Sequence, residues 1–228
     1  MSRGINKEVA TMTGKGKIFQ ALSAVSLRDK ERPLEKRKRE SRESLFMDLP
    51  VLETQRLRLR AVTMRDAKDI HQYSSDPEVA RYVLWSEHDS LSQTRAYIRY
   101  ILRQYRAGEP TSFCIEHKET HKAIGTIGFM WLSSEYRSAE VGYSIAREHW
   151  NKGFMSEALA EVLSFGFEYL DLNRIEAQHD TRNPASGRVM VKVGMEREGT
   201  LRQRIYNKGC FVDVDMYAIT RDRWVRQG

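Results

Sequence analysis

The fold is decided by one stretch of the sequence, Ala139-Glu-Val-Gly-Tyr-Ser-Ile-Ala-Arg-Glu-His-Trp-Asn-Lys-Gly-Phe-Met-Ser-Glu-Ala158. Its first half alternates between apolar and polar side chains, which predicts a half-buried strand with Val141, Tyr143 and Ile145 on one face. From Phe154 and Met155 onward, apolar residues recur every three or four positions, as in a helix. The stretch therefore predicts a strand, a glycine turn and a helix in direct succession.

The turn between them reads Asn151-Lys152-Gly153. The first turn of a helix has backbone N–H groups without partners and carries the positive end of the helix dipole. Glycine lets an anion approach the backbone closely, and Lys152 adds a positive charge. The turn is thus a candidate site for a phosphate or pyrophosphate group. The alternative is a plain loop that joins a strand to a helix without any ligand.

Several short motifs follow one another in a fixed order in and after this stretch. They are Ala139 to Tyr143, Trp150 to Phe154, Glu157-Ala158, Asn183-Pro-Ala-Ser186, Lys192-Val-Gly-Met195, and Glu198-Gly199 with Gly209-x-x-x-Asp213. In this order they resemble the GNAT acetyltransferase superfamily, specifically its ribosomal-protein-alanine N-acetyltransferase branch. The similarity extends roughly from Leu52 to Trp224.

The order of the expected elements indicates an α/β fold. A meander of strands precedes one βαβ-like passage, so the central sheet is expected to be partly antiparallel. The expected strands are residues 57–61, 111–116, 123–132, 139–146, 174–179, 198–206 and 211–220. The resemblance implies the GNAT fold, a mixed sheet of about six to seven strands flanked by helices. In that fold the strands equivalent to 140–146 and 174–179 splay apart, and the pantetheine of acetyl-CoA lies between them.

Helix signals precede the meander. Thr63 is placed to cap a helix that begins at Met64, and Asp76-Pro77 begins another short one. Ser90-x-x-Gln93 is a capping box that opens a longer helix, which Gly108 closes. The resemblance implies that these helices flank the substrate groove.

The positive charge of the chain is concentrated near its N-terminus. Residues 1–45 hold twelve Lys or Arg against six Asp or Glu, and the remaining residues hold 26 against 25. We therefore expect two parts, a basic and mobile extension at residues 1–45 and a GNAT domain at residues 46–228. A nearly neutral folded part gives little reason to expect nucleic acid as its substrate. The extension is either a weak ribosome- or RNA-binding arm or a solvated segment.

Cysteine usage and hydropathy indicate the compartment. Cys114 and Cys210 show no metal-ligand spacing, and both are expected in the core of a protein from the reducing cytoplasm. No metal is expected. There is no run of eighteen apolar residues and no secretory signal, so we expect no membrane contact.

The resemblance implies an enzyme that transfers the acetyl group of acetyl-CoA to an amine by direct attack in a ternary complex. The N-terminal amine of a protein or peptide, such as a ribosomal protein, is the expected acceptor. One alternative acceptor is a small molecule such as a polyamine, an antibiotic or an amino acid. Another alternative is a non-catalytic module that binds CoA or docks on the ribosome. A nucleotide-binding protein is disfavoured because the chain lacks a Gly-x-x-x-x-Gly-Lys-Ser/Thr run.

Two residues are candidates for the chemistry. Glu140 either takes the proton of the amine or holds the amine, unless it merely pairs with an arginine on a solvated face. An α-amino group needs only a modest base, because its pKa is near 7.7–8.0. Ser186 is expected to hydrogen-bond or protonate the leaving sulfur. Met190 occupies the position of the tyrosine acid of many GNAT enzymes, and Tyr206 is a possible substitute for Ser186.

The resemblance also implies a set of residues that bind acetyl-CoA. Asn183 is expected to bind pantetheine amides, or to cap the helix that begins at Pro184. Met155 is bulkier than the alanine usual at its position, and His149 and His179 are expected to be structural. The full set is Val141, Tyr143, Ile145, Trp150, Asn151, Lys152, Gly153, Phe154, Met155, Ser156, Asn183 and Ser186.

Overall fold

The computed structural model describes residues 45–227. The chain divides into two units, residues 1–40 and residues 41–228. The described residues all belong to the second unit. The mobile extension predicted at residues 1–45 therefore lies, apart from Leu45, outside the described residues.

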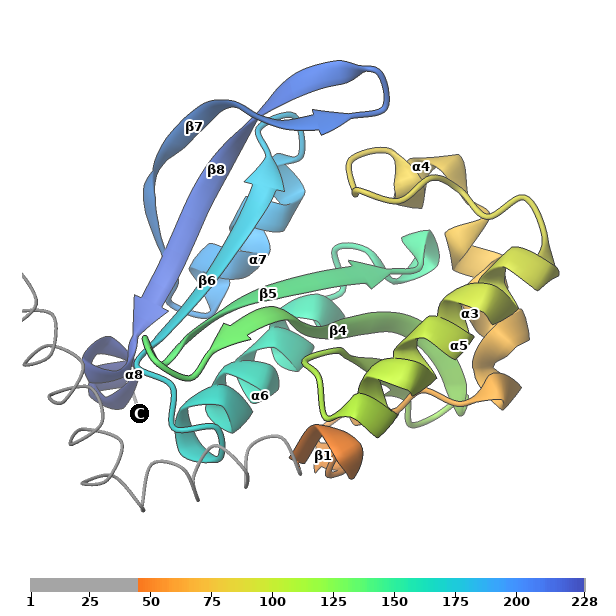
Figure 1. The fold of residues 1–228 in the computed structure, drawn as a ribbon, viewed down its shortest axis with the longest axis horizontal. Coiled ribbons are helices and arrows are strands. Elements are labelled where there is room, and N and C mark those ends of the chain that lie inside the picture. Colours follow the sequence, from red (N-terminus) through yellow and green to blue (C-terminus); the bar gives the residue numbers. More distant parts are fainter. Residues whose placement is uncertain (1–44, 228) are drawn as a thin grey trace, which may run out of the picture. The chain divides into compact units, whose positions relative to one another are not determined.

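A mixed eight-stranded sheet forms the centre of this unit (Figure 1), in the order β1-β2-β3-β4-β5-β6-β8-β7. Neighbouring strands are antiparallel except β5 and β6, which run parallel. The strands are β1 (Leu52–Glu53), β2 (Leu57–Ala61), β3 (Ser112–His117), β4 (Lys122–Ser133), β5 (Ser138–Ile145), β6 (Arg174–Asp180), β7 (Glu196–Asn207) and β8 (Cys210–Thr220). The predicted mixed sheet is confirmed. The predicted count of six to seven strands misses β1, because two residues are too few to show alternation.

Helices cover both faces of the sheet. Helices α3 and α5 pack against each other, and α3 also contacts β4, while α6 lies behind the sheet and α7 packs beside it on β6 (Figure 1). The helical elements are η1 (Met64–Asp66), α3 (Ala67–Ser74), α4 (Pro77–Ala80), α5 (Leu91–Ala107), η2 (Arg147–His149), α6 (Phe154–Glu168), α7 (Pro184–Lys192) and α8 (Arg221–Gln227). None of the helices between residues 45 and 227 is long and apolar enough to cross a membrane.

The expected helix caps are present with one change. The Thr63 side chain accepts a hydrogen bond from the backbone of η1 and completes a capping box there. Ser90 accepts from the Gln93 N–H as predicted, but the Gln93 side chain bonds the backbone N–H of Asp89, one residue further out. Gly108 ends α5 in the left-handed conformation, with φ 67°.

An aromatic cluster joins the sheet to α6. The Phe165 ring of α6 packs edge-on against Phe113, and Phe129 contacts both Phe165 and Phe46. Cys114 is buried as predicted, but the prediction for Cys210 is wrong, because this cysteine is exposed. It is the first residue of β8, next to the turn of the β7–β8 hairpin, where the sheet extends beyond the helices.

We predict that Gly128 in β4 tolerates no side chain. A Cβ atom there would lie 2.2 Å from the backbone oxygen of Thr111, too close for any relaxation that keeps the strands paired. Gly128→Ala should lower the unfolding free energy by about 2–3 kcal/mol, which corresponds to a fall in Tm of roughly 4–12 °C. The matched control is Gly199→Ala in β7, where a Cβ atom meets nothing within 4 Å. Equal melting temperatures of the two variants would contradict the described approach of the two strands.

Candidate active site

Strands β5 and β6 are paired at one end only. Ser138, Ala139 and Glu140 are in register with Arg174, Ile175 and Glu176, and the pairing stops there. Beyond that point β5 stays bonded to β4, and β6 stays bonded to β8. Each strand therefore turns a row of unpaired N–H and C=O groups toward the other, and Figure 1 shows the two strands diverging. The separation that the resemblance implied is present, and its edges suit an extended ligand that adds as a strand would.

The turn after β5 presents backbone donors at the start of α6. Asn151 has φ 58° and Gly153 has φ 82°, so the chain makes a left-handed turn before Phe154. The first intrahelical bond joins the Glu157 N–H to the Gly153 carbonyl at 3.0 Å. None of the hydrogen bonds found between residues 45 and 227 uses the backbone N–H groups of residues 151–156. This end of α6 is therefore a suitable site for an anion.

Arg56 and Glu157 organise the charges around the turn. The Arg56 guanidinium donates to the Lys152 carbonyl at 3.0 Å and lies 4.3 Å from the centre of the Phe154 ring. Glu157 accepts from the Thr54 hydroxyl at 2.6 Å and from the Arg56 Nε at 2.7 Å. Burial alone would raise the pKa of Glu157, but these hydrogen bonds outweigh it and lower that pKa. The carboxylate is thus neutralised by Arg56, while the exposed Lys152 has no described ion-pair partner.

The bulky side chains of the turn point away from its exposed side. Phe154 and Met155 are both buried in the core, so they offer only their backbone N–H groups to a ligand. The Met155 side chain therefore does not block the approach of an anion. Trp150 donates from its indole Nε1 to the Ile145 carbonyl at 2.9 Å and ties the turn to the end of β5.

Two histidines that we expected to be structural are both packed against aromatic rings. His149 contacts the rings of His117 and Phe154, which also contact each other, and burial lowers the pKa of His149. His179 lies beside Tyr217 and bonds the Asp180 carbonyl through Nδ1.

Tyr143 and Ser186 join the two walls of the separation. The Tyr143 hydroxyl donates to the Ser186 backbone oxygen at 3.0 Å, and the Ser186 hydroxyl donates to the Tyr143 oxygen at 3.0 Å. Burial raises the pKa of Tyr143, so the phenol stays protonated at neutral pH and acts as a donor. Asn183 stands at the N-cap position of α7, but its side chain makes no capping hydrogen bond. Its amide is therefore available to a ligand.

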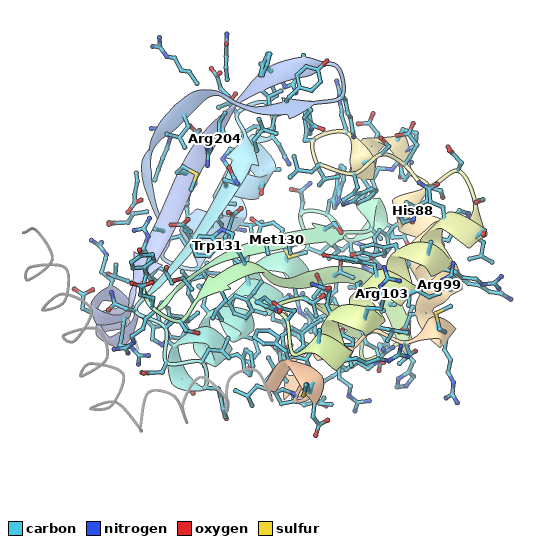
Figure 2. The ribbon with its side chains drawn as sticks, in the orientation of Figure 1. His88, Arg99, Arg103, Met130, Trp131 and Arg204 are labelled. Carbon is cyan, nitrogen blue, oxygen red and sulfur yellow. The ribbon has the colours of Figure 1, made fainter. Side chains whose placement is uncertain are left out.

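Both carboxylate oxygens of Glu140 accept a hydrogen bond from a neutral donor. The Trp131 indole Nε1 lies 2.8 Å from Oε2, and the Gln178 Nε2 lies 2.8 Å from Oε1. The alternative that Glu140 pairs with an arginine is therefore not what the structure shows. Trp131 follows a bulge at Met130, where the register of β4 against β5 shifts, and Figure 2 shows both residues on the central strands.

Tyr206, the possible substitute for Ser186, lies outside this group. Its ring is exposed on β7 and packs against Phe211 at 5.0 Å between ring centroids. The structure thus brings together the turn, the Tyr143–Ser186 pair, Asn183 and Glu140 around the separation of β5 and β6. In the described part of the chain, no group of three or more His, Cys, Asp or Glu side chains is arranged to hold a metal ion.

These residues fit coenzyme A. Its pyrophosphate needs backbone donors and positive charge, which residues 151–156 and Lys152 supply, and its pantetheine amides need unpaired strand edges and the Asn183 amide.

Sequence reasoning missed Arg56, Trp131 and Gln178. A contact between residues about a hundred positions apart has no local signal, and the bulge at Met130 breaks the alternation that would have placed Trp131 on a face.

Comparison with known proteins gives matches along most of the chain. A family described as "Acetyltransferase (GNAT) domain" matches residues 56–196. The uncharacterized N-acetyltransferase YoaA of Bacillus subtilis is 41% identical over 174 residues, 76% of this chain and 98% of that protein. Ribosomal-protein-serine acetyltransferase of Escherichia coli is 25% identical over 165 residues, 71% of this chain and 91% of that protein. Spermidine N(1)-acetyltransferase of Vibrio cholerae is 24% identical over 172 residues, 75% of this chain and 96% of that protein.

Solved structures of acetyltransferases have a similar fold. A GNAT-family acetyltransferase from Bacillus anthracis superposes with a TM-score of 0.68 at 27% identity, over 76% of this chain and 99% of that one. Mycobacterium smegmatis RimJ in complex with CoA-disulfide has a TM-score of 0.66 at 25% identity, over 73% of this chain and 82% of that one.

The turn at Gly153 generates a prediction about coenzyme binding. In Gly153→Val a side chain would cover the backbone N–H groups and strain the positive φ, so the Kd for acetyl-CoA should rise at least about tenfold. Isothermal titration calorimetry measures this Kd. Gly209→Val is the matched control, because Gly209 has φ 87° and open space around it, far along the β7–β8 hairpin. The two variants should lose similar thermal stability, and an unchanged Kd in Gly153→Val would remove the turn from the coenzyme site.

Proposed function

The chain belongs to the GNAT acetyltransferase family and is an N-acetyltransferase that uses acetyl-CoA, and from this premise we propose that its acceptor is the N-terminal amine of a protein or peptide. The observation that carries the proposal is the Glu140 carboxylate, which is fixed by two neutral donors at the point where β5 and β6 separate. Ribosomal proteins are one acceptor class within this proposal, because ribosomal-protein-serine acetyltransferase of Escherichia coli is a relative of this chain.

The cost of deprotonating the amine favours an α-amine over a lysine side chain. At pH 7 an α-amino group with pKa 7.7–8.0 costs about 1 kcal/mol to deprotonate, and a lysine with pKa 10.4 costs about 4.6 kcal/mol. A single carboxylate held by neutral hydrogen bonds is a modest base. It suffices for the first group and is poorly matched to the second.

Exposed positive charge on α5 and β7 disfavours a polyamine as the acceptor. Arg95, Arg99 and Arg103 lie exposed on α5, and none has an ion pair with an acidic side chain between residues 45 and 227. Figure 2 shows Arg99 and Arg103 on α5 and Arg204 on β7, on either side of the strands that carry Met130 and Trp131. Exposed arginines on α5 and β7 repel a polycation and tolerate a neutral or acidic peptide.

In the proposed reaction the amine nitrogen attacks the thioester carbonyl, forming an N–C bond while the C–S bond breaks. Glu140 takes the proton that the nitrogen loses. The Ser186 hydroxyl turns from the Tyr143 oxygen to donate a hydrogen bond to the departing sulfur. The thiolate takes one proton from water and leaves as the free thiol, and Glu140 returns its proton to water. Residues 151–156 hold the coenzyme end that does not react, so that binding energy there orients the acetyl group. Contact of the 1–45 extension with the ribosome or RNA stays a prediction.

A peptide panel tests the acceptor and Glu140 together. The wild type with acetyl-CoA should acetylate peptides at their N-termini and release free thiol, with little transfer to spermidine or an aminoglycoside. Glu140→Gln should lower kcat/KM for peptides by about 10²-fold or more, and raising the pH should recover part of the loss because the amine then deprotonates in solution.

Glu135→Gln is the control, since Glu135 is exposed in the β4–β5 turn and has no role in the site. Transfer to spermidine or an aminoglycoside and to no peptide would overturn the acceptor. Full activity of Glu140→Gln would overturn the role of Glu140.

A further inference from the structure

Gln178 links the two diverging strands at the site of the proposed chemistry. It lies in β6, two residues beyond the last residue paired with β5, and its amide Nε2 donates to Glu140 Oε1 at 2.8 Å. An ionised carboxylate can only accept hydrogen bonds, so the amide must turn its NH₂ group toward Glu140. This contact therefore assigns the two ends of the Gln178 amide: Nε2 faces Glu140, and Oε1 is the other end.

The carbonyl oxygen of the same amide has no donor. Gln178 Oε1 is buried, and no hydrogen-bond partner for it exists among residues 45–227. Buried amide oxygens in native proteins are nearly always paired, because an unpaired one is costly. The missing partner must be a donor, and it must reach the side of Gln178 next to Glu140. Glu140 itself keeps lone pairs free, since its two oxygens accept one described bond each.

We propose that Gln178 Oε1 and the Glu140 carboxylate bind the two N–H bonds of the acceptor amine together, which makes the enzyme specific for primary amines. The inference rests on the proposed function through the role of Glu140. A neutral primary amine has one substituent, two N–H bonds and one lone pair in a tetrahedral arrangement. When both N–H bonds are held, the lone pair has one direction left, and that direction is the one available for attack on the thioester carbonyl.

The fate of the two hydrogens follows from this arrangement. The proton on the Glu140 side leaves with the attack and passes to the carboxylate. The hydrogen on the Gln178 side stays on nitrogen and becomes the N–H of the product amide. A secondary amine, such as an N-methylated or proline N-terminus, has one N–H bond only, which Glu140 requires. With a secondary amine bound, the buried Gln178 Oε1 therefore has no hydrogen-bond donor.

Trp131 acts as a positioning residue for this pair. Its indole holds Glu140 Oε2 while Gln178 holds Oε1, so the carboxylate is fixed from both sides before the amine arrives. Such groups need no reorganisation during the reaction.

The test compares two peptides of one sequence, one with N-terminal alanine and one with N-methylalanine. Wild-type kcat/KM should be roughly 10–10²-fold higher for the primary amine, the range expected when a buried acceptor loses its donor. In Gln178→Met, which removes the amide and keeps the length of the side chain, this ratio should collapse toward one through loss of activity on the primary amine. The Kd for acetyl-CoA should stay unchanged. Gln72→Met, on the exposed side of α3, should leave the ratio as in the wild type.

Two outcomes would overturn the inference. A wild type that acetylates both peptides equally well would overturn it. An equal loss on both peptides in Gln178→Met would also overturn it, because Gln178 would then only support Glu140. Should Gln178→Met fail to fold, Gln178→Asn replaces it, because this shorter side chain moves the carbonyl back by one methylene. The ratio of kcat/KM for the primary and the N-methylated peptide must then fall toward one in Gln178→Asn as well. If no peptide is a substrate, the proposed acceptor fails separately, and the same ratio is measured with whichever primary amine is acetylated and its N-methyl derivative.

Discussion

The structure depends on the early end of pairing between two parallel strands. After Glu140 and Glu176, β5 and β6 no longer bond to each other, although each remains bonded to its outer neighbour. A sheet interrupted in this way leaves backbone N–H and C=O groups without a strand partner, and an extended ligand can pair with them. The separation also places the start of α6, the start of α7 and the Glu140 carboxylate around one space. The binding of a long coenzyme and the chemistry at its end therefore have a common structural origin.

The separation of β5 and β6 has a positively charged site at one end and a negatively charged carboxylate at the other. At the start of α6, backbone N–H groups and Lys152 provide positive potential without a neutralising acid, because Arg56 already pairs with Glu157. At the closed end, Glu140 is held by neutral donors only, so its negative charge remains available to an amine. Anion binding and amine activation are thus kept apart along β5. The Tyr143–Ser186 contact lies between them and ties β5 to α7.

The sequence was sufficient to predict the strands, helices and turns that have a repeating local pattern of residues. Alternation identified β5, the three- and four-residue period identified α6, and Gly153 marked the turn that the structure shows at φ 82°. The order of motifs supplied the family and the separation of the strands. Contacts between distant residues had no such signal, so Arg56 and Gln178 were missed, and so was Trp131 beyond its bulge. The environment of Cys210 was misjudged because a strand pattern does not tell whether helices cover that part of the sheet.

The central claim is that the N–H groups of residues 151–156 bind the pyrophosphate of coenzyme A while the coenzyme lies along the unpaired edge of β5. Amide hydrogen exchange with and without saturating acetyl-CoA measures this directly, because these groups have no partner in the free protein. The account predicts strong protection of residues 151–156 and of the β5 edge at residues 141–145, with no change at the β7–β8 turn. Unchanged exchange at residues 151–156, while calorimetry shows the coenzyme bound, would contradict it.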